Sequence, residues 1–461
     1  MTAAKLRVWP AITRARIAPE IYGHQIEMVG QSVYEGIWIG RASRISNEEG
    51  LRMDVLAILK HLRVPVLKWP GDTFANYYHW RDGIGTGKAR EQRVNIPWQQ
   101  IEPNAFGTHE FMLLCEKVGC KPWITCNSAT GSYRDALEWI EYCTFGGDTS
   151  LTRLRTHNGS PDPFEVPCWT YTGGGDEESL RVLNSEITET SEAKLPTKTN
   201  QNATKTHHTS HILETTGGAS FGKEGYLHSI ASFCRFESSF RRFALSIAST
   251  SPENPPTIAV SQWGVKHPEA TPESGLDQPV TLRDALLTAA FLHCFNDHAA
   301  QLRLAAMAQA VNSLLCLVKT RDSEVFLTPA YHVVDMMQPH KDARLLFNEL
   351  ESPRLALPPA AGGPSSVPAL SVSTSRARKR LCITVANLSC TDEIPLQVEI
   401  REATIVNLSG RILTAASPTA ENSFEAPKVV TPARLNLTPE ATTFSHVMPP
   451  HAFAVFIVTL K

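Results

Sequence analysis

Short apolar segments alternate with amphipathic ones along the first part of the chain. The segments 64–69, 111–117, 121–127 and 166–171 are rich in apolar, β-branched and aromatic residues, and we expect each to form a strand. The stretch 134–143 has the spacing of an amphipathic helix. Repetition of strand and helix predicts a parallel sheet covered by helices.

The same alternation continues towards residue 325. A strand is expected at 257–260, helices at 282–298 and 302–311, and a further strand at 314–318. Beyond about residue 325 the pattern changes to short alternating strands with frequent turn signals, as at 381–386. Such a pattern is typical of an all-β sandwich.

One segment fits neither pattern. Residues 184–210 are polar and poor in apolar side chains. Such a composition buries too little surface to offset the entropy lost on ordering, so we expect a disordered loop there.

Composition narrows the class of protein. The chain has 461 residues, of which 42% are hydrophobic and 20% charged, with a net charge of −2. These values fit a globular protein of more than one domain and give no indication of a nucleic-acid or membrane partner. The first ten residues lack the apolar run of a secretory signal, which predicts a cytoplasmic protein with reduced thiols. His207, His208 and His211 have no Asp or Cys at metal-binding spacing, so neither a metal nor a cofactor is expected.

Several ordered blocks identify a family. The blocks include IYGHQIEMVG at 21–30, YHWRDGIG at 78–85, NAFGTHEF at 104–111 and MAQAVN at 307–312. Together they resemble the intracellular α-L-arabinofuranosidases of glycoside hydrolase family 51. The resemblance covers most of the chain.

The resemblance implies the architecture. Family members have a (β/α)8 TIM barrel with a C-terminal antiparallel β-sandwich, which here assigns residues 17–324 to the barrel and 325–461 to the sandwich. Residues 1–16 are expected to add a strand to the sandwich. The interval between the expected fourth and sixth barrel strands is short and polar, so we expect one strand to be absent. Either real degeneration of the barrel or a misplaced exon boundary in the gene model would explain the short interval.

The resemblance also implies a reaction. Family members hydrolyse terminal non-reducing α-L-arabinofuranosyl residues of glycans with retention, using two carboxyl groups about 5 to 5.5 Å apart. Gln262 matches the nucleophilic Glu, with Trp263 fixing the register. The acid/base pattern Trp-x-x-Gly-Asn-Glu starts at Trp169 and places Gly173 and Gly174 at the Asn and Glu positions. Both catalytic carboxyl groups are therefore expected to be missing.

Other sugar-contacting positions are partly retained. Glu27 and Gln309 match family positions, Thr73 replaces an Asn, and His211 is the best match for a strand-six His. Glu27 could equally be a buried acid that holds a loop, and Gln309 a helix-surface amide.

Three interpretations follow from these residues. The first is an arabinofuranosidase with weak or absent activity on an arabinofuranosyl oligosaccharide, and a homo-oligomer by family resemblance. The second is a non-catalytic protein that binds a furanoside or an active paralogue. The third is an enzyme whose acid has moved to Asp176, Glu177 or Glu178, residues that equally fit a solvated helix start.

Overall fold

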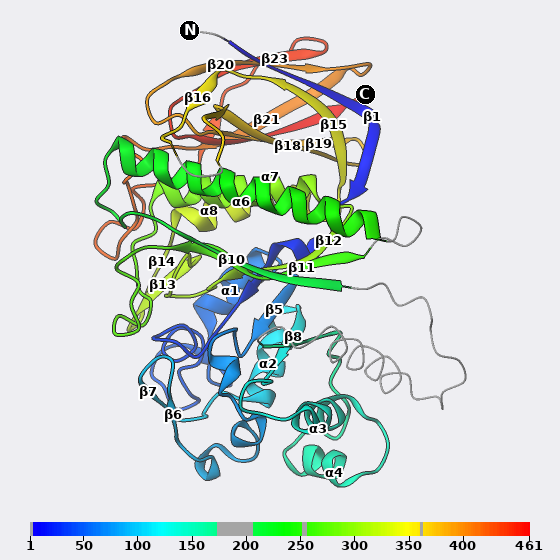
Figure 1. Ribbon diagram of the computed structural model, residues 1–461, viewed down its shortest axis with the longest axis vertical. Coiled ribbons are helices and arrows are strands. Elements are labelled where there is room, and N and C mark those ends of the chain that lie inside the picture. The colour runs from blue at the N-terminus through cyan, green and yellow to red at the C-terminus, as the bar shows by residue number, and fades with distance from the viewer. Residues whose placement is uncertain (1–2, 173–205, 251–255, 360–362) are drawn as a thin grey trace.

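The computed structural model describes residues 3–172, 206–250, 256–359 and 363–461 (Figure 1). Two sheets lie one above the other along the long axis, and helices α6 (Lys223–Thr250), α7 (Leu282–Asp297) and α8 (Pro329–Met337) lie between them. The N-terminus and the C-terminus both lie at the upper sheet.

The lower sheet is parallel throughout. It has seven strands among the described residues, in the order β10-β11-β12-β2-β5-β8-β9. The strands are β2 (Gly23–Gln25), β5 (Val66–Trp69), β8 (Lys121–Cys126), β9 (Cys168–Tyr171), β10 (Thr206–Glu214), β11 (Thr257–Lys266) and β12 (Leu302–Ala308). The predicted parallel sheet is confirmed.

The two outer strands of this sheet, β9 and β10, flank residues 173–205. The position of the strand expected to be absent therefore lies outside the described residues. The polar segment 184–210 also lies outside them, except for residues 206–210, which begin β10. The strand thus starts earlier than composition suggests, because pairing with β11 supplies backbone hydrogen bonds that a polar sequence can use.

Helices cover the outer side of the parallel sheet. Besides those already named, they are α1 (Met53–His61), α2 (Thr108–Val118), α3 (Tyr133–Thr144) and α4 (Ser150–His157). Side chains cap the N-termini of α3 and α4. The Ser132 side chain accepts a hydrogen bond from the Asp135 N–H, and the Thr149 side chain accepts one from the Thr152 N–H. Gly119 ends α2 in the left-handed conformation, at φ 78°.

Three predicted elements are wrong. Residues 111–117 belong to α2 and are not a strand, and Glu110 starts that helix by accepting from the Gly107 N–H at 2.9 Å. Residues 302–308 form β12 and not a helix, because this apolar run is central in the sheet and is paired on both sides. In the segment 314–318 only Val318 is in a strand. Short apolar runs do not distinguish a buried strand from a helix by periodicity.

The upper sheet is antiparallel except where β1 joins it. Its order is β22-β21-β24-β19-β18-β15-β1-β20-β23. The strands are β1 (Ala4–Arg16), β15 (Arg344–Glu351), β18 (Leu370–Ala377), β19 (Arg380–Asn387), β20 (Ile394–Ile400), β21 (Ile405–Leu413), β22 (Ala433–Leu435), β23 (Thr443–Met448) and β24 (Phe453–Leu460). The first strand β1 pairs antiparallel with β15 and parallel with β20, so the N-terminal segment lies within this C-terminal sheet.

Four hairpins complete the described strands. They are β3 (Asn47–Glu48) with β4 (Leu51–Arg52), β6 (Arg93–Asn95) with β7 (Gln100–Glu102), β13 (Val318–Arg321) with β14 (Glu324–Leu327), and β16 (Arg354–Ala356) with β17 (Ser366–Pro368). The pair β6–β7 belongs to the long loop after β5, and β13–β14 follows β12. Both hairpins therefore extend loops at the carboxyl ends of barrel strands.

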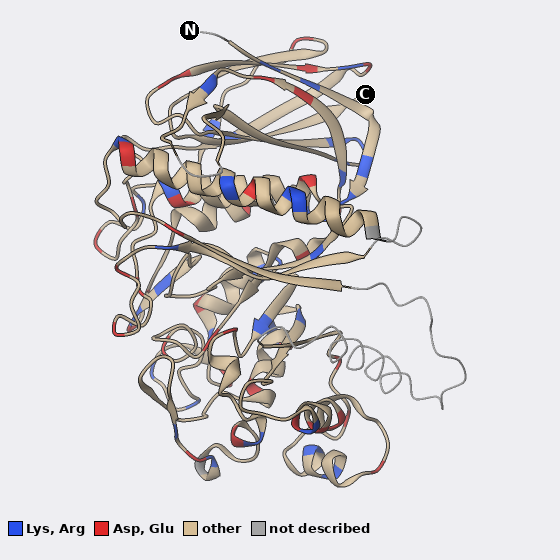
Figure 2. Cartoon of the chain, in the orientation of Figure 1, with Lys and Arg blue, Asp and Glu red and all other residues tan. Residues whose placement is uncertain are grey.

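Basic and acidic residues are mixed over the described part of the chain. Figure 2 shows Lys and Arg interspersed with Asp and Glu over both sheets and the helices. None of the helices in the described ranges is long and apolar enough to cross a bilayer. All ten cysteines are free thiols.

The main core lies between the parallel strands and the helices. Trp263 of β11 is 1% exposed, and its ring centroid lies 5.2 Å from that of Phe291 and 5.4 Å from that of Phe295, both on α7. This packing fixes which side of β11 faces the helices.

Replacing Trp263 by alanine tests that packing. We expect Trp263→Ala to lower the free energy of unfolding by about 3 to 5 kcal/mol, because it opens a cavity between β11 and α7. Leu245→Ala is the control, since Leu245 is 64% exposed and its loss should change stability by no more than about 0.5 kcal/mol. Equal effects in denaturant unfolding would contradict the assigned orientation of β11.

Candidate active site

Polar side chains gather where β2, β5 and β12 end. Glu27 lies just beyond β2, Asp72 and Thr73 lie beyond β5, and Gln309 directly follows β12. Carboxyl ends of parallel barrel strands meet at one face, which is where barrel enzymes carry their sites. The structure brings Glu27 and Gln309 into direct contact.

Glu27 is the centre of this cluster. Its side chain is buried, and its Oε1 accepts a hydrogen bond from the Phe74 N–H at 2.7 Å. Its Oε2 accepts from Gln25 Nε2 and Gln309 Nε2, each at 3.1 Å. Burial raises the pKa of Glu27 to about 7, and the charge of Asp72 adds to the rise. The bond from Phe74 shows that Glu27 also holds the loop after β5.

Gly71 makes room for that carboxyl group. Its φ is 119°, and a Cβ at this position would lie 2.3 Å from Cγ of Glu27. Any other residue would therefore be strained and would displace the Glu27 side chain. The Gly in the block Lys68–Gly71 is thus required by close approach of the β5 loop to Glu27.

Gln309 presents a free acceptor. It is fully buried, and the peptide bond that precedes it is cis. Its Nε2 is used by Glu27, whereas its Oε1 is buried without a partner among the described residues. Its place after β12 is not that of a helix-surface amide. An unpaired buried amide oxygen is costly unless a ligand hydroxyl or a water donates to it.

Lys68 connects the cluster to the barrel interior. Its side chain is fully buried, and its Nζ donates to Gln25 Oε1 at 3.2 Å and to the Ser261 carbonyl oxygen at 3.0 Å. Nζ also forms an ion pair with Asp72 and lies 5.3 Å from the ring centroid of Trp123. One ammonium group therefore joins β2, β5, β8 and β11.

A β-bulge sets the orientation around Gln262. In the pairing with β10, Thr209 is opposite Val260 and Ser210 is opposite Gln262, so Ser261 is the extra residue. Val260 and Trp263 both belong to the core on the helix side. Ser261 and Gln262 lie between them and are both half-buried. Strand parity with this bulge indicates that Gln262 faces the barrel interior, as the matched position requires.

The remaining predicted contacts are placed differently. Thr73 is exposed at the rim, directly before Phe74. His211 lies apart from Glu27, because its ring packs on α6 with centroids 4.7 Å from Phe236 and 6.1 Å from Phe240. Gly173 and Gly174 lie outside the described residues, as do the three acids at 176–178.

His208 has the opposite orientation to His211 on β10. Burial lowers the pKa of His208 to about 4, and the neighbouring charges of Lys68 and Asp72 act on it in opposite directions. His208 therefore lies on the side of β10 that faces Lys68. Sequence reasoning missed Lys68, Asp72 and this His, although a Lys within the apolar strand 66–69 is a visible signal of a buried charge.

A cavity of about 580 Å³ adjoins the cluster. Its lining includes Trp98, Gln100, Ser274, Asn312 and Ser313, all from loops after barrel strands. Gln100 Nε2 donates to the Met28 carbonyl oxygen at 3.2 Å, which places this cavity one residue from Glu27. None of Glu27, Asp72 and Gln309 lines this cavity.

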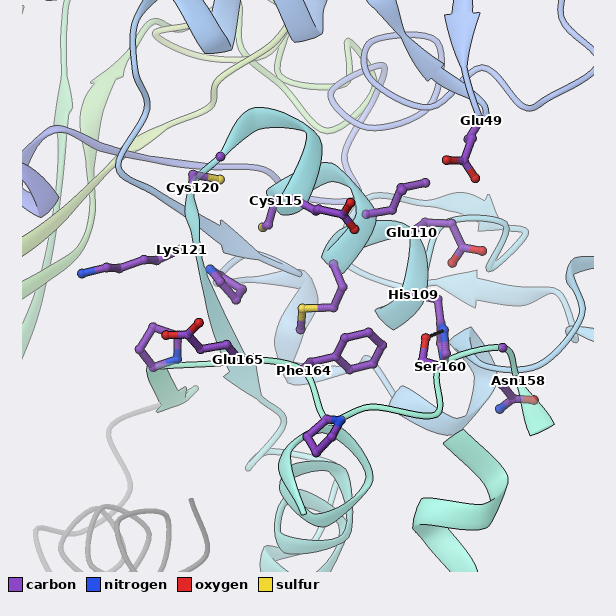
Figure 3. Close-up of a pocket in the computed structure, with 18 of the residues that line it drawn as sticks. Glu49, His109, Glu110, Cys115, Cys120, Lys121, Asn158, Ser160, Phe164 and Glu165 are labelled. Carbon is purple, nitrogen blue, oxygen red and sulfur yellow. Dashed lines mark hydrogen bonds between the residues drawn. The ribbon is translucent and has the colours of Figure 1, made fainter. Parts of the chain in front are cut away.

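A larger groove of about 970 Å³ runs along the outer side of α2 (Figure 3). In it His109 Nδ1 lies 3.1 Å from Ser160 Oγ, while His109 Nε2 lies 2.6 Å from the Tyr142 hydroxyl. These bonds tie α2 to α3 and to the loop after α4. No residue of the Glu27 cluster lines this groove. In the parts of the chain that are described, no group of His, Cys, Asp or Glu is arranged to hold a metal ion.

Comparison with known proteins agrees with the fold. Two family models match, the α-L-arabinofuranosidase 1 domain at residues 58–180 and the α-L-arabinofuranosidase C-terminal domain at residues 262–452. An intracellular exo-α-L-arabinofuranosidase of Bacteroides ovatus is 30% identical over 455 residues, covering 90% of this chain and 88% of the relative.

Solved structures extend the agreement. The GH51 arabinofuranosidase of Xanthomonas axonopodis pv. citri has a TM-score of 0.89 at 25% identity, with 100% of both chains covered. The α-L-arabinofuranosidase of Thermotoga maritima, in an arabinose complex, has a TM-score of 0.85 at 26% identity, with 99% of this chain and 100% of the other covered. The parallel sheet and its polar mouth define a glycosidase-type barrel with a C-terminal β-sandwich. The chain belongs to the α-L-arabinofuranosidases of glycoside hydrolase family 51.

The raised pKa of Glu27 predicts a pH-dependent stability. A carboxyl group whose folded pKa lies above its unfolded value stabilises the fold below the unfolded pKa, and this contribution is lost as pH rises through the folded pKa. From pH 4.5 to 7 we expect the free energy of unfolding of the parent to fall by up to about 3 kcal/mol relative to that of Glu27→Gln. Glu102, whose pKa burial also raises to about 7, is present in both proteins and cancels. Parallel stability curves for the two proteins would contradict the buried, proton-binding state of Glu27.

Proposed function

We propose that this protein binds a terminal α-L-arabinofuranosyl residue of a glycan and hydrolyses it weakly or not at all. The observation that carries the proposal is Gln262 at the position of the family nucleophile, on a strand whose register is fixed by Trp263. A side-chain amide does not form the glycosyl ester that retaining hydrolysis needs. Gly174 at the acid/base position removes the second carboxyl group.

Support for binding comes from Glu27 and Gln309. The carboxyl group of Glu27 and the unpartnered Oε1 of Gln309 are acceptors at one place, and sugar hydroxyls are donors. A site with buried, preplaced acceptors favours a ligand that supplies the missing hydrogen bonds. Exposed Thr73 at the rim offers a hydroxyl to the same ligand.

The expected loss of rate is large. Removing one member of a catalytic constellation costs about 10⁴ to 10⁶ in turnover, and the effects of further losses are not additive. Activity close to the uncatalysed rate is therefore consistent with intact binding. With activity that low, the protein is a pseudoenzyme that binds a furanoside or an active paralogue.

Three further features belong to the proposal. We place the domain boundaries after residues 16 and 324, in keeping with the pairing of β1 in the upper sheet. A cytoplasmic location is supported by the description of the Bacteroides ovatus relative as intracellular. Homo-oligomer formation is proposed from the family resemblance alone.

An aryl α-L-arabinofuranoside with an activated leaving group tests catalysis, because it needs little acid assistance. We expect turnover at least about 10⁴-fold below that of a family enzyme with both carboxyl groups. Gln262→Ala should leave the residual rate unchanged, since the amide does not act as a nucleophile. Fast turnover of the parent would overturn the proposed loss of activity.

Binding is tested separately by thermal unfolding with L-arabinose. We expect saturating L-arabinose to raise the Tm of the parent and not of Glu27→Ala, because the variant loses an acceptor and the anchor of the β5 loop. Glu269→Ala is a matched control, since Glu269 accepts from the Gly218 N–H outside the Glu27 cluster. If L-arabinose does not raise the Tm of the parent, the proposed sugar binding is wrong.

A further inference from the structure

The buried ammonium of Lys68 requires a negative partner. Transfer of an unpaired charge into a barrel interior costs several kcal/mol, so such a group is paired or neutralised. The Glu expected at position 262 is absent, and Lys68 reaches only the carbonyl oxygen of the neighbouring Ser261 on that strand. Its charged partner is Asp72.

Asp72 lies beside the Glu27 cluster. Lys68 Nζ forms both the ion pair with Asp72 and the hydrogen bond to the Ser261 carbonyl oxygen, so one ammonium group links Asp72 to the residue that precedes Gln262 in β11. Asp72 directly follows Gly71, whose backbone approaches Glu27 so closely that a Cβ there would lie 2.3 Å from Cγ of Glu27. In keeping with this approach, the charge of Asp72 contributes to the raised pKa of Glu27.

The geometry leaves one oxygen of Asp72 available. Lys68 binds its Oδ1, whereas Oδ2 forms no hydrogen bond within the described residues. The side chain is 24% exposed, in contrast to the buried Glu27. Two other carboxyl groups near the mouth are held differently. Glu102 is 1% exposed, with Oε1 accepting from the Asn104 N–H at 2.8 Å, and Asp277 pairs with Lys319. Neither of them is bonded to Lys68 within the described residues.

From this arrangement we infer that Asp72 replaces the missing carboxylate at position 262 and is the nucleophile of any residual arabinofuranoside cleavage. The inference rests on the proposed function, because it requires an arabinofuranosyl residue at Glu27 and Gln309. Lys68 is a positioning residue that keeps the carboxylate at the mouth. Thr73 and Phe74 follow Asp72 directly, so the same loop holds the sugar site and the nucleophile.

The reaction proceeds in two balanced steps with an activated aryl arabinofuranoside. Asp72 Oδ2 forms a bond to the anomeric carbon while the bond to the aryl oxygen breaks, and the electron pair leaves with the phenolate. Water then attacks the anomeric carbon, the carboxylate of Asp72 is released, and the proton of the water passes to solvent. Two displacements at one carbon retain its configuration.

A covalent probe tests the assignment. The parent protein is incubated with a cyclitol aziridine of α-L-arabinofuranose configuration, which a carboxylate opens with formation of an ester, and the modified peptide is identified by mass spectrometry. We expect one adduct per chain on Asp72, formed at least tenfold more slowly in the presence of saturating L-arabinose. Asp148→Asn, which changes an exposed acid on the loop before α4, should be labelled like the parent, and Asp72→Asn should not be labelled.

The outcomes separate this inference from the proposed function. Stabilisation by L-arabinose without an adduct, or with an adduct on another residue, would overturn the role of Asp72 and leave sugar binding intact. No stabilisation by L-arabinose would overturn the proposed function and this inference together. If Asp72→Asn does not fold because Lys68 is left unpaired, the double variant Lys68→Met/Asp72→Asn replaces it as the variant that should not be labelled. In either case, the residue that carries the adduct in the parent decides the assignment.

Discussion

The polar interior of the barrel depends on the buried ammonium group of Lys68. A charge at that depth is tolerated only when every neighbouring group is placed to compensate it. Asp72, Gln25 and the Ser261 carbonyl provide that compensation from three strands or their loops. Gln25 Oε1 accepts a hydrogen bond from Lys68, and Nε2 of the same amide therefore points to Glu27 and donates to it. The orientation of Glu27 and Gln309 thus follows from the position of one charge.

Scaffold and chemistry are separable in this protein. The core between β11 and α7 is a packed aromatic cluster that does not depend on the side chain at position 262. A barrel can therefore keep its fold and its sugar acceptors after its catalytic carboxyl groups are lost. The ion pair of Lys68 with Asp72 compensates the buried ammonium group without a carboxylate at position 262.

The sequence predicted the fold class, because ordered family blocks specify a barrel followed by a β-sandwich. It also singled out Glu27 and Gln309, although not the hydrogen bond between them. It did not predict α2 and β12 correctly, since short apolar runs such as 111–117 and 302–308 fit either a helix or a buried strand. The orientation of His211 towards Phe236 depends on strand parity around a bulge, which composition does not reveal. The ion pair of Lys68 with Asp72 was not predicted, because the two residues, four apart in sequence, meet only where the chain turns at the end of β5.

A crystal structure of the protein after a short soak in an arabinofuranosyl oligosaccharide tests the central claim most directly. Binding without efficient cleavage predicts an intact oligosaccharide whose terminal residue donates hydrogen bonds to Glu27 and to Oε1 of Gln309. Free arabinose at that position, with the rest of the oligosaccharide released, would show an active glycosidase and contradict the claim. An oligosaccharide bound only elsewhere, with Glu27 and Gln309 unoccupied, would contradict it as well.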